Sequence, residues 1–150
     1  MKAITIYQPW ASLIAARAKQ FETRPWQTAY RGPIAIHAGA KKPSSLLTAL
    51  DDCLVLHAAK ALGLIVAGAY HGVAEVIRLL DKLPRGAIIA TATLAECQYT
   101  QSRLHEISET EMVSGDWRIG RYAWKLENVE LLLEPTQARG QQGLWEWRTA

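Results

Sequence analysis

The sequence predicts an α+β fold built on a small curved β-barrel, and two observations carry that prediction. Several segments have the β-branched and alternating residues of strands, whereas only two early segments have the apolar spacing of helices. In addition, residues 121–133 change the face occupied by their apolar residues after Asn128. Such a change indicates a β-bulge or bend, the device that curls a sheet towards a barrel.

The predicted strands are rich in β-branched or alternating apolar residues, and most are bounded by proline, glycine or polar residues. They comprise residues 3–7, 21–24, 34–37, 69–80, 87–98, 121–133 and 143–148. Two helices are expected. The first covers residues 10–18, and the second starts at residues 43–45 and stops before Gly63. Residues 101–115 are polar and irregular, with room for one helical turn.

Composition indicates one globular domain over residues 1–150. Apolar residues make up 49% and charged residues 21% of the chain, which excludes disordered and collagen-like proteins. The sequence contains no G-x-G dinucleotide fingerprint, Walker loop, G-x-S-x-G elbow or H-E-x-x-H motif. The two cysteines and four histidines lack the spacing of metal ligands, so we expect neither a metal nor a cofactor.

Localisation is predicted from the apolar segments and the cysteines. The longest apolar stretch, residues 61–70, is too short to span a bilayer. The N-terminal segment is broken at Gln8-Pro9 before a signal-type apolar run develops. Cys53 and Cys97 are far apart and are expected to be reduced. These features predict a soluble cytoplasmic protein with no membrane partner.

Positive charge is concentrated at the N-terminal end. Residues 1–42 carry seven Lys or Arg residues and one Glu, a net charge of +6, whereas the remaining residues carry −3. This distribution indicates either a site for an anionic ligand or a solvated charged face.

The strongest candidate for chemistry is the group Lys19, Glu22 and Arg24. On a strand, Glu22 and Arg24 face the same side, and Lys19 at the preceding turn can swing towards them. In a cleft, the two cations could bind phosphate or a base edge while Glu22 accepts from an amino group. A partly desolvated lysine beside a carboxylate could instead perform acid–base work. The structural alternative is a surface ion pair with one core arginine.

The chain has six tryptophans and one phenylalanine, and two of the tryptophans support the same region as a ligand-binding site. Trp10 and Trp26 flank the charged group in sequence, and aromatic rings among basic residues suit stacking on nucleobases. The alternative is that these rings fill the barrel, which we favour for Trp145 and Trp147. Trp26, next to Pro25, is expected near the mouth of the cleft.

At these residues the sequence resembles the ASCH domain family, whose signature is Gly-x-Lys-x-x-Glu-x-Arg. The matching stretch is residues 17–24, in which Lys19, Glu22 and Arg24 agree and Arg17 replaces the glycine. A glycine there would ease the turn that leaves the helix. The resemblance extends over nearly the whole chain, through residues 8–11, 30–38, 83–92, 120–124 and 139–145.

The resemblance implies a PUA-like barrel of six to seven strands with two to three helices, and a module that binds RNA or a nucleotide. The residues expected to bind the ligand are Gln8, Trp10, Lys19, Glu22, Arg24, Trp26, Arg31 and His37. In this interpretation the cations meet phosphate or base acceptors, Glu22 accepts from a base amine and a tryptophan stacks.

Some branches of the family are hydrolases, which implies an alternative function. One branch resembles amidohydrolases that remove acetyl from N4-acetylcytidine, and another cleaves RNA. Lys19 matches the lysine of the amidohydrolase branch, and Lys19 with Glu22 would be the catalytic pair. The threonine of that branch is Glu22 here, and Thr23 is one residue away, on the opposite face of a strand.

Overall fold

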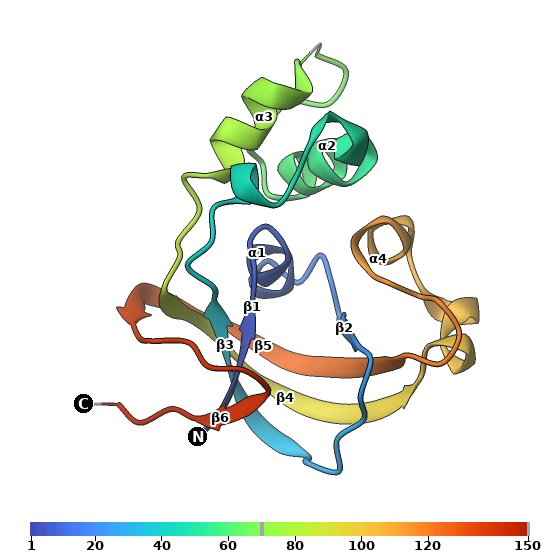
Figure 1. The fold of residues 1–150 in the computed structure, drawn as a ribbon, viewed down its shortest axis with the longest axis vertical. Coiled ribbons are helices and arrows are strands. Elements are labelled where there is room, and N and C mark those ends of the chain that lie inside the picture. Colours follow the sequence, from blue (N-terminus) through green and yellow to red (C-terminus); the bar gives the residue numbers. More distant parts are fainter. Residues whose placement is uncertain (70, 150) are drawn as a thin grey trace.

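The structure is a computed structural model that describes residues 1–69 and 71–149, in which six strands form one curled sheet (Figure 1). The strands are β1 (Lys2–Ile6), β2 (Phe21–Arg24), β3 (Gly32–Ala38), β4 (Ala87–Tyr99), β5 (Tyr122–Gln137) and β6 (Leu144–Glu146). Their order is β2-β5-β4-β3-β1-β6, a half-barrel in which only β1 and β3 run parallel. The α+β class is confirmed, and the six strands agree with the six to seven that the family resemblance implies.

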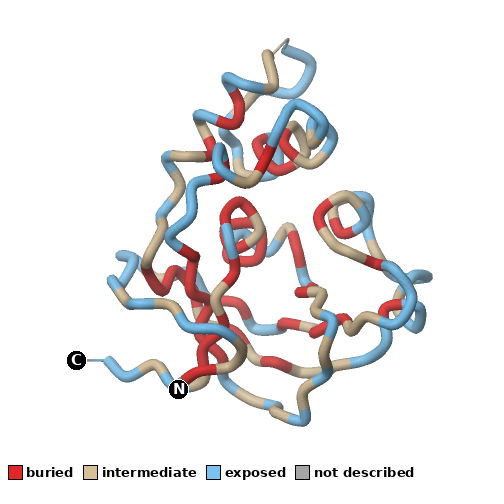
Figure 2. The backbone as a smooth tube through the Cα atoms, viewed as in Figure 1, coloured by how far each residue is buried: buried red, intermediate tan, exposed pale blue. Residues whose placement is uncertain are grey.

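Helices cover one side of the sheet. They are α1 (Trp10–Ala15), α2 (Asp52–Ala61), α3 (Val73–Leu80) and α4 (Glu109–Ser114). Figure 2 shows α1 deeply buried between the sheet and the layer formed by α2 and α3. No helix in the described ranges combines the length and apolar character needed to cross a membrane.

The two largest hydrophobic clusters of the described residues stabilise this arrangement. The sheet cluster joins α1 to the inner faces of β1, β3, β4 and β5, with Ile4, Ile14, Ile34, Leu94 and Trp124 among its members. The helical cluster lies between α2 and α3 and includes Val55, Val76 and Leu80. Trp10 packs against both clusters, so it connects the helical layer to the body of the protein.

The bulge expected in β5 is present. Thr91 pairs with Glu130, whereas Thr93 pairs with Glu127, so β5 carries one extra residue between these two pairs. Asn128, within this step, has a φ of 50°. A left-handed residue at a bulge bends the strand and increases its twist, which explains how a single 16-residue strand curls around the sheet.

The strand predicted over residues 69–80 is wrong. Residues Val73–Leu80 form α3, while Tyr70 lies outside the described residues. Val76, Ile77 and Leu80 are buried at positions i, i+1 and i+4, which is helical spacing. The β-branched residues favoured a strand in isolation, but packing against α2 decides for a helix.

The second predicted helix is shorter than expected. Its first part is two 3₁₀ turns, Pro43–Ser45 and Ala49–Asp51, and α2 begins only at Asp52. The Thr48 hydroxyl accepts from the backbone N–H of Leu50, and the Asp51 carboxylate accepts from the Thr48 amide. This capping box begins the second 3₁₀ turn, which leads into α2. Leu50, in the second of these turns, is 94% exposed.

Candidate functional site

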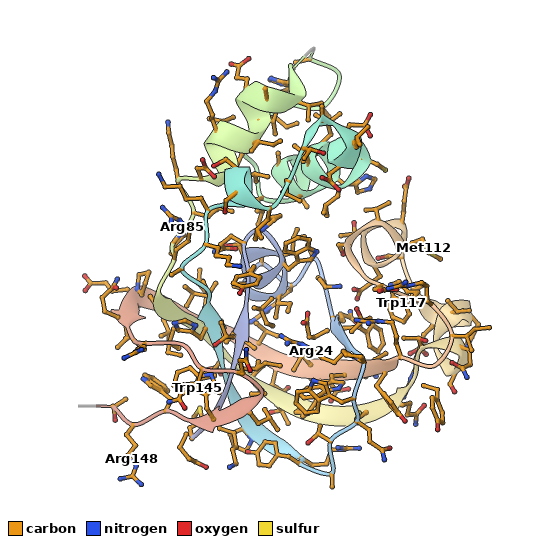
Figure 3. All side chains as sticks on the ribbon, viewed as in Figure 1. Arg24, Arg85, Met112, Trp117, Trp145 and Arg148 are labelled. Atoms are coloured by element: carbon orange, nitrogen blue, oxygen red, sulfur yellow. The ribbon has the colours of Figure 1, made fainter. Side chains whose placement is uncertain are left out.

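A cleft of about 500 Å³ opens between the end of β1, β2, α2 and the segment after α4. Charged side chains enter it from β2 and from residues 116–121, and apolar ones from α1 and α2. Figure 3 shows Arg24, one of the charged residues, near the centre of the molecule. The side chains that give the cleft its chemistry are Tyr7, Trp10, Glu22, Arg24, Leu54, Asp116 and Arg121.

Glu22 and Arg24 form the polar centre of the cleft. Arg24 Nε donates to Glu22 Oε1 at 2.8 Å, and Arg24 Nη2 donates to the Thr5 carbonyl at 2.9 Å. The Glu22 side chain is 12% exposed and that of Arg24 is 23% exposed, so the pair is held but still reachable. Within the described ranges, Glu22 Oε2 and Arg24 Nη1 make no other hydrogen bond. One acceptor and one donor therefore remain available.

The segment after α4 contributes two charged residues to the cleft, Asp116 and Arg121. The Thr23 hydroxyl accepts from the Asp116 amide at 3.0 Å, which ties this segment to β2. The hydrogen bond from Arg118 lowers the pKa of Asp116 to about 2, with Arg121 adding to the effect. Asp116 is thus ionised at neutral pH, and its charge is balanced by two arginines.

Aromatic side chains border the charged pair. Trp10 is half-buried at the start of α1, and Tyr7 is 41% exposed just after β1. Indole and phenol faces next to a donor and an acceptor suit a flat heteroaromatic ring. The cleft can therefore offer both stacking and edge recognition.

Trp26 does not line this cleft. Its ring packs edge-to-face on Trp124, with ring centroids 4.6 Å apart, and Trp124 Nε1 donates to the Trp26 carbonyl at 3.3 Å. Trp26 is half-buried against the sheet cluster. Its neighbour Pro25 predicts a ring at the mouth of the cleft, but packing on the apolar surface of Trp124 determines its position.

The Lys19 ammonium group pairs with Glu111 rather than with Glu22. It lies 3.2 Å from Glu111 Oε1, and the two side chains are 1% and 4% exposed. Glu111 Oε2 also accepts from the backbone amides of Gln20 and Phe21, at 2.7 and 3.1 Å. Glu111 therefore fastens α4 to the turn between α1 and β2, and the expected three-residue group is divided.

Arg17 occupies the position of the signature glycine, and its backbone is left-handed with a φ of 61°. This conformation favours glycine, because a Cβ atom crowds the following carbonyl there. Arg17 compensates with its side chain, whose Nε and Nη2 both donate to the Val129 carbonyl, at 3.0 and 2.7 Å. The turn keeps its geometry and is tied to β5.

The remaining predicted ligand residues lie outside the cleft. Gln8 is buried, accepts from the Ser12 amide and donates to the Pro84 carbonyl, so it fixes the start of α1. Arg31 is exposed, and its guanidinium donates to nearby backbone carbonyls. His37 is 1% exposed and lies in a second hollow, on the other side of β1.

Sequence reasoning missed Asp116, Arg121 and Glu111. All three lie in or after the segment interpreted as irregular, about 90 residues from the parts of the chain they contact. The serine at position 108 gave one local signal, since it caps α4 through the Glu111 amide. No feature of the neighbouring sequence predicts which strand α4 contacts. No three His, Cys, Asp or Glu side chains in the described residues converge as a metal site.

Comparison with known proteins supplies the family. The model of the ASCH domain matches residues 4–136. Human activating signal cointegrator 1 is 49% identical over 41 residues, which are 27% of this chain and 7% of that protein. The mouse protein of the same name is 44% identical over 41 residues, with the same coverage. The similar segment is therefore a small part of these much longer relatives.

The family match includes every residue that lines the cleft, from Thr5 to Arg121. It also contains the residues that agree with the signature, Lys19, Glu22 and Arg24. The chain therefore belongs to the ASCH domain family, PUA-like modules that are generally associated with RNA binding.

Proposed function

We propose that this chain binds RNA or a nucleotide through the cleft beside β2. The observation that carries the proposal is the Glu22–Arg24 pair, in which a carboxylate oxygen and a guanidinium nitrogen remain unpaired within the described residues. Nucleobase edges present donors and acceptors next to each other. Glu22 accepts from a base amino or imino group, and Arg24 donates to a carbonyl or ring nitrogen.

Trp10 supplies the stacking surface in this proposal. Its ring lines the same cleft and is held from behind by both hydrophobic clusters. A ring fixed before the ligand arrives loses little side-chain entropy on binding. Base–aromatic stacking is worth about 1–3 kcal/mol by alanine substitution and tolerates any base, so Trp10 supplies affinity while the ion pair recognises the base edge.

Charge in the cleft is compatible with a polyanionic ligand. Asp116 is the second carboxylate of the lining, and Arg118 and Arg121 offset its charge. The N-terminal 42 residues, which contribute β1, α1 and β2, carry a net charge of +6. Binding through phosphates makes affinity fall as salt rises.

The test is a fluorescence anisotropy titration with a labelled single-stranded RNA octamer at about 50 mM salt. Glu22→Gln preserves the shape of the side chain but replaces an acceptor by a donor, so we expect affinity to fall about tenfold or more. Arg24→Gln is expected to have a similar effect. Arg78→Gln is the matched control, because Arg78 is exposed on α3 and lies outside the cleft.

Two results would contradict the proposal. One is the absence of RNA binding by the unaltered protein at low salt. The other is equal affinity of the Glu22, Arg24 and Arg78 variants, which would locate binding elsewhere on the molecule.

The hydrolase alternative gains no support from the geometry. The lysine that the resemblance assigns to catalysis, Lys19, has its ammonium group within 3.2 Å of Glu111 and does not line this cleft. Glu22 is paired with Arg24 rather than with Lys19. A general base must reach the proton that it removes, so we do not propose catalysis.

A further inference from the structure

A second hollow, of about 370 Å³, lies next to the cleft. Thr5 and Tyr7 line both spaces, so the end of β1 and the residue after it form the shared border. The Thr5 carbonyl accepts from Arg24 in the cleft, while the Thr5 hydroxyl accepts from Trp145 Nε1 on the side of the second hollow. A ligand that occupies the cleft can therefore continue into the second hollow across one short stretch of chain.

The second hollow is positively charged. Lys41 and Arg139 line it from two separate loops, both are exposed, and the lining contains no Asp or Glu among the described residues. The Lys41 ammonium lies 5.5 Å from the centroid of the Tyr7 ring, at the border with the cleft. Two cations with no neighbouring carboxylate attract an anion.

The floor of this hollow is closely packed. A Cβ added to Gly140 would lie 2.5 Å from His37 Cε1 and 2.8 Å from Thr5 Oγ1, so only glycine fits beside them. His37 Nε2 donates to the Ala138 carbonyl at 2.9 Å, and the imidazole packs edge-to-face on Trp145. The backbone of the loop that carries Arg139 is therefore held close to β1 and β3.

His37 lines the same hollow but is packed against Gly140. It is 1% exposed, and its Nδ1 has no hydrogen-bond partner within the described residues. Because Nε2 donates to the Ala138 carbonyl, Nδ1 of the neutral ring is an acceptor and does not pair with a phosphate oxygen, which is also an acceptor. The attraction of this hollow for an anion therefore comes from Lys41 and Arg139.

We propose that this second hollow binds a backbone phosphate of a nucleic-acid strand, between Lys41 and Arg139. The inference rests on the proposed function and makes it more specific. The base lies in the cleft with Glu22 and Arg24, and the neighbouring phosphodiester crosses Tyr7 into the second hollow. The ligand is then a strand of at least two nucleotides rather than a free nucleoside.

The first experiment compares the Lys41→Gln/Arg139→Gln double variant with Arg78→Gln in the anisotropy titration, from about 50 to 200 mM salt. Both substituted side chains are exposed, so the fold is expected to survive, and thermal melting checks this. We expect about tenfold weaker binding at low salt. The slope of log affinity against log salt should flatten by about 0.7 for each phosphate that the variant no longer neutralises.

A DNA octamer of the same sequence separates phosphate from sugar contacts. An equal loss of affinity for RNA and DNA in the double variant supports the proposal, because both strands carry the same phosphates. A loss confined to RNA would overturn it, since that result would indicate contact with the 2′-hydroxyl. Unchanged binding by the double variant would also overturn it, while leaving the proposed function intact.

A last measurement addresses the hollow without RNA. Inorganic phosphate is titrated into the ¹⁵N-labelled protein, and the amide signals of residues 139–142 are followed by NMR. We expect these signals to shift in the unaltered protein and not in the double variant. If the protein bound no RNA, the proposed function would fail, and this titration alone would decide whether the anion site exists. No shift would overturn the inference.

Discussion

The two ion pairs around β2 differ in exposure and in role. Lys19 and Glu111 are 1% and 4% exposed and join two elements of the fold. Glu22 and Arg24 are 12% and 23% exposed and line the cleft. Three of these four residues occur within six positions of one sequence motif. The comparison shows that a short motif can divide its residues between holding the fold and forming a site.

Removal of the buried partner is expected to have the largest effect on stability. Glu111→Ala leaves the Lys19 ammonium buried without a counter-charge and leaves the amides of Gln20 and Phe21 without their acceptor. We expect a loss of about 3–5 kcal/mol in the free energy of unfolding, measured by urea denaturation. RNA affinity per folded molecule should not change, because neither side chain of the pair lines the cleft.

Glu111→Gln is the matched control, since the amide oxygen can still accept from the backbone while the charge is lost. It should fall between the unaltered protein and Glu111→Ala. A cost of less than about 1 kcal/mol for Glu111→Ala would mean that this pair behaves like a surface ion pair, and the contrast between the two pairs would then fail.

Trp26→Ala is expected to have an intermediate effect, on stability rather than on binding. Its half-buried ring contributes apolar burial and an edge-to-face contact with Trp124. Together these should cost about 1–3 kcal/mol in thermal or urea unfolding. RNA affinity of the folded variant should remain that of the unaltered protein, whereas Trp10→Phe should weaken it by reducing the stacking surface. A binding defect in Trp26→Ala with a normal melting temperature would instead favour the position expected from sequence.

The smallest effect is expected from the partly exposed carboxylate of Asp116. Its pKa is lowered to about 2, first by the hydrogen bond from Arg118, so the folded state favours the ionised form. This contribution is present above the ordinary pKa of about 4 and is lost as the pH falls towards 2. The side chain is 31% exposed, so the contribution should be less than about 1 kcal/mol.

Melting temperatures of Asp116→Asn and the unaltered protein test this at pH 6 and pH 2. The variant should melt slightly earlier at pH 6, and the difference should shrink at pH 2. A difference that grows on acidification would mean that the carboxylate is held in its protonated form.

The sequence predicted what depends on local spacing. The period of a strand was enough to bring Glu22 and Arg24 to one side, and the change of apolar face after Asn128 correctly indicated the bulge. The signature glycine position correctly indicated a special turn, which Arg17 adopts in a left-handed conformation. These features are decided within a few residues of the chain.

The sequence did not predict what depends on distant partners. Lys19 donates to Glu111, which is 92 positions away in the sequence, although Glu22 is its near neighbour. The position of the Trp26 ring depends on its contact with Trp124, which is 98 positions away in the sequence. The helix over residues Val73–Leu80 depends on packing against α2, which local strand propensity does not reflect. In each case a tertiary contact outweighs the preference of the neighbouring sequence for another partner or conformation.

The separation of the helical cluster from the sheet cluster has a consequence for local unfolding. The layer of α2 and α3 has its own apolar contacts and is connected to the sheet cluster through Trp10. Such a layer can open as a separate cooperative unit, below the cost of global unfolding. We expect the backbone amides of α2 and α3 to exchange with deuterium faster than those of β3 and β4. Because Leu54 of α2 lines the cleft, each opening of this layer would also remove one wall of the site.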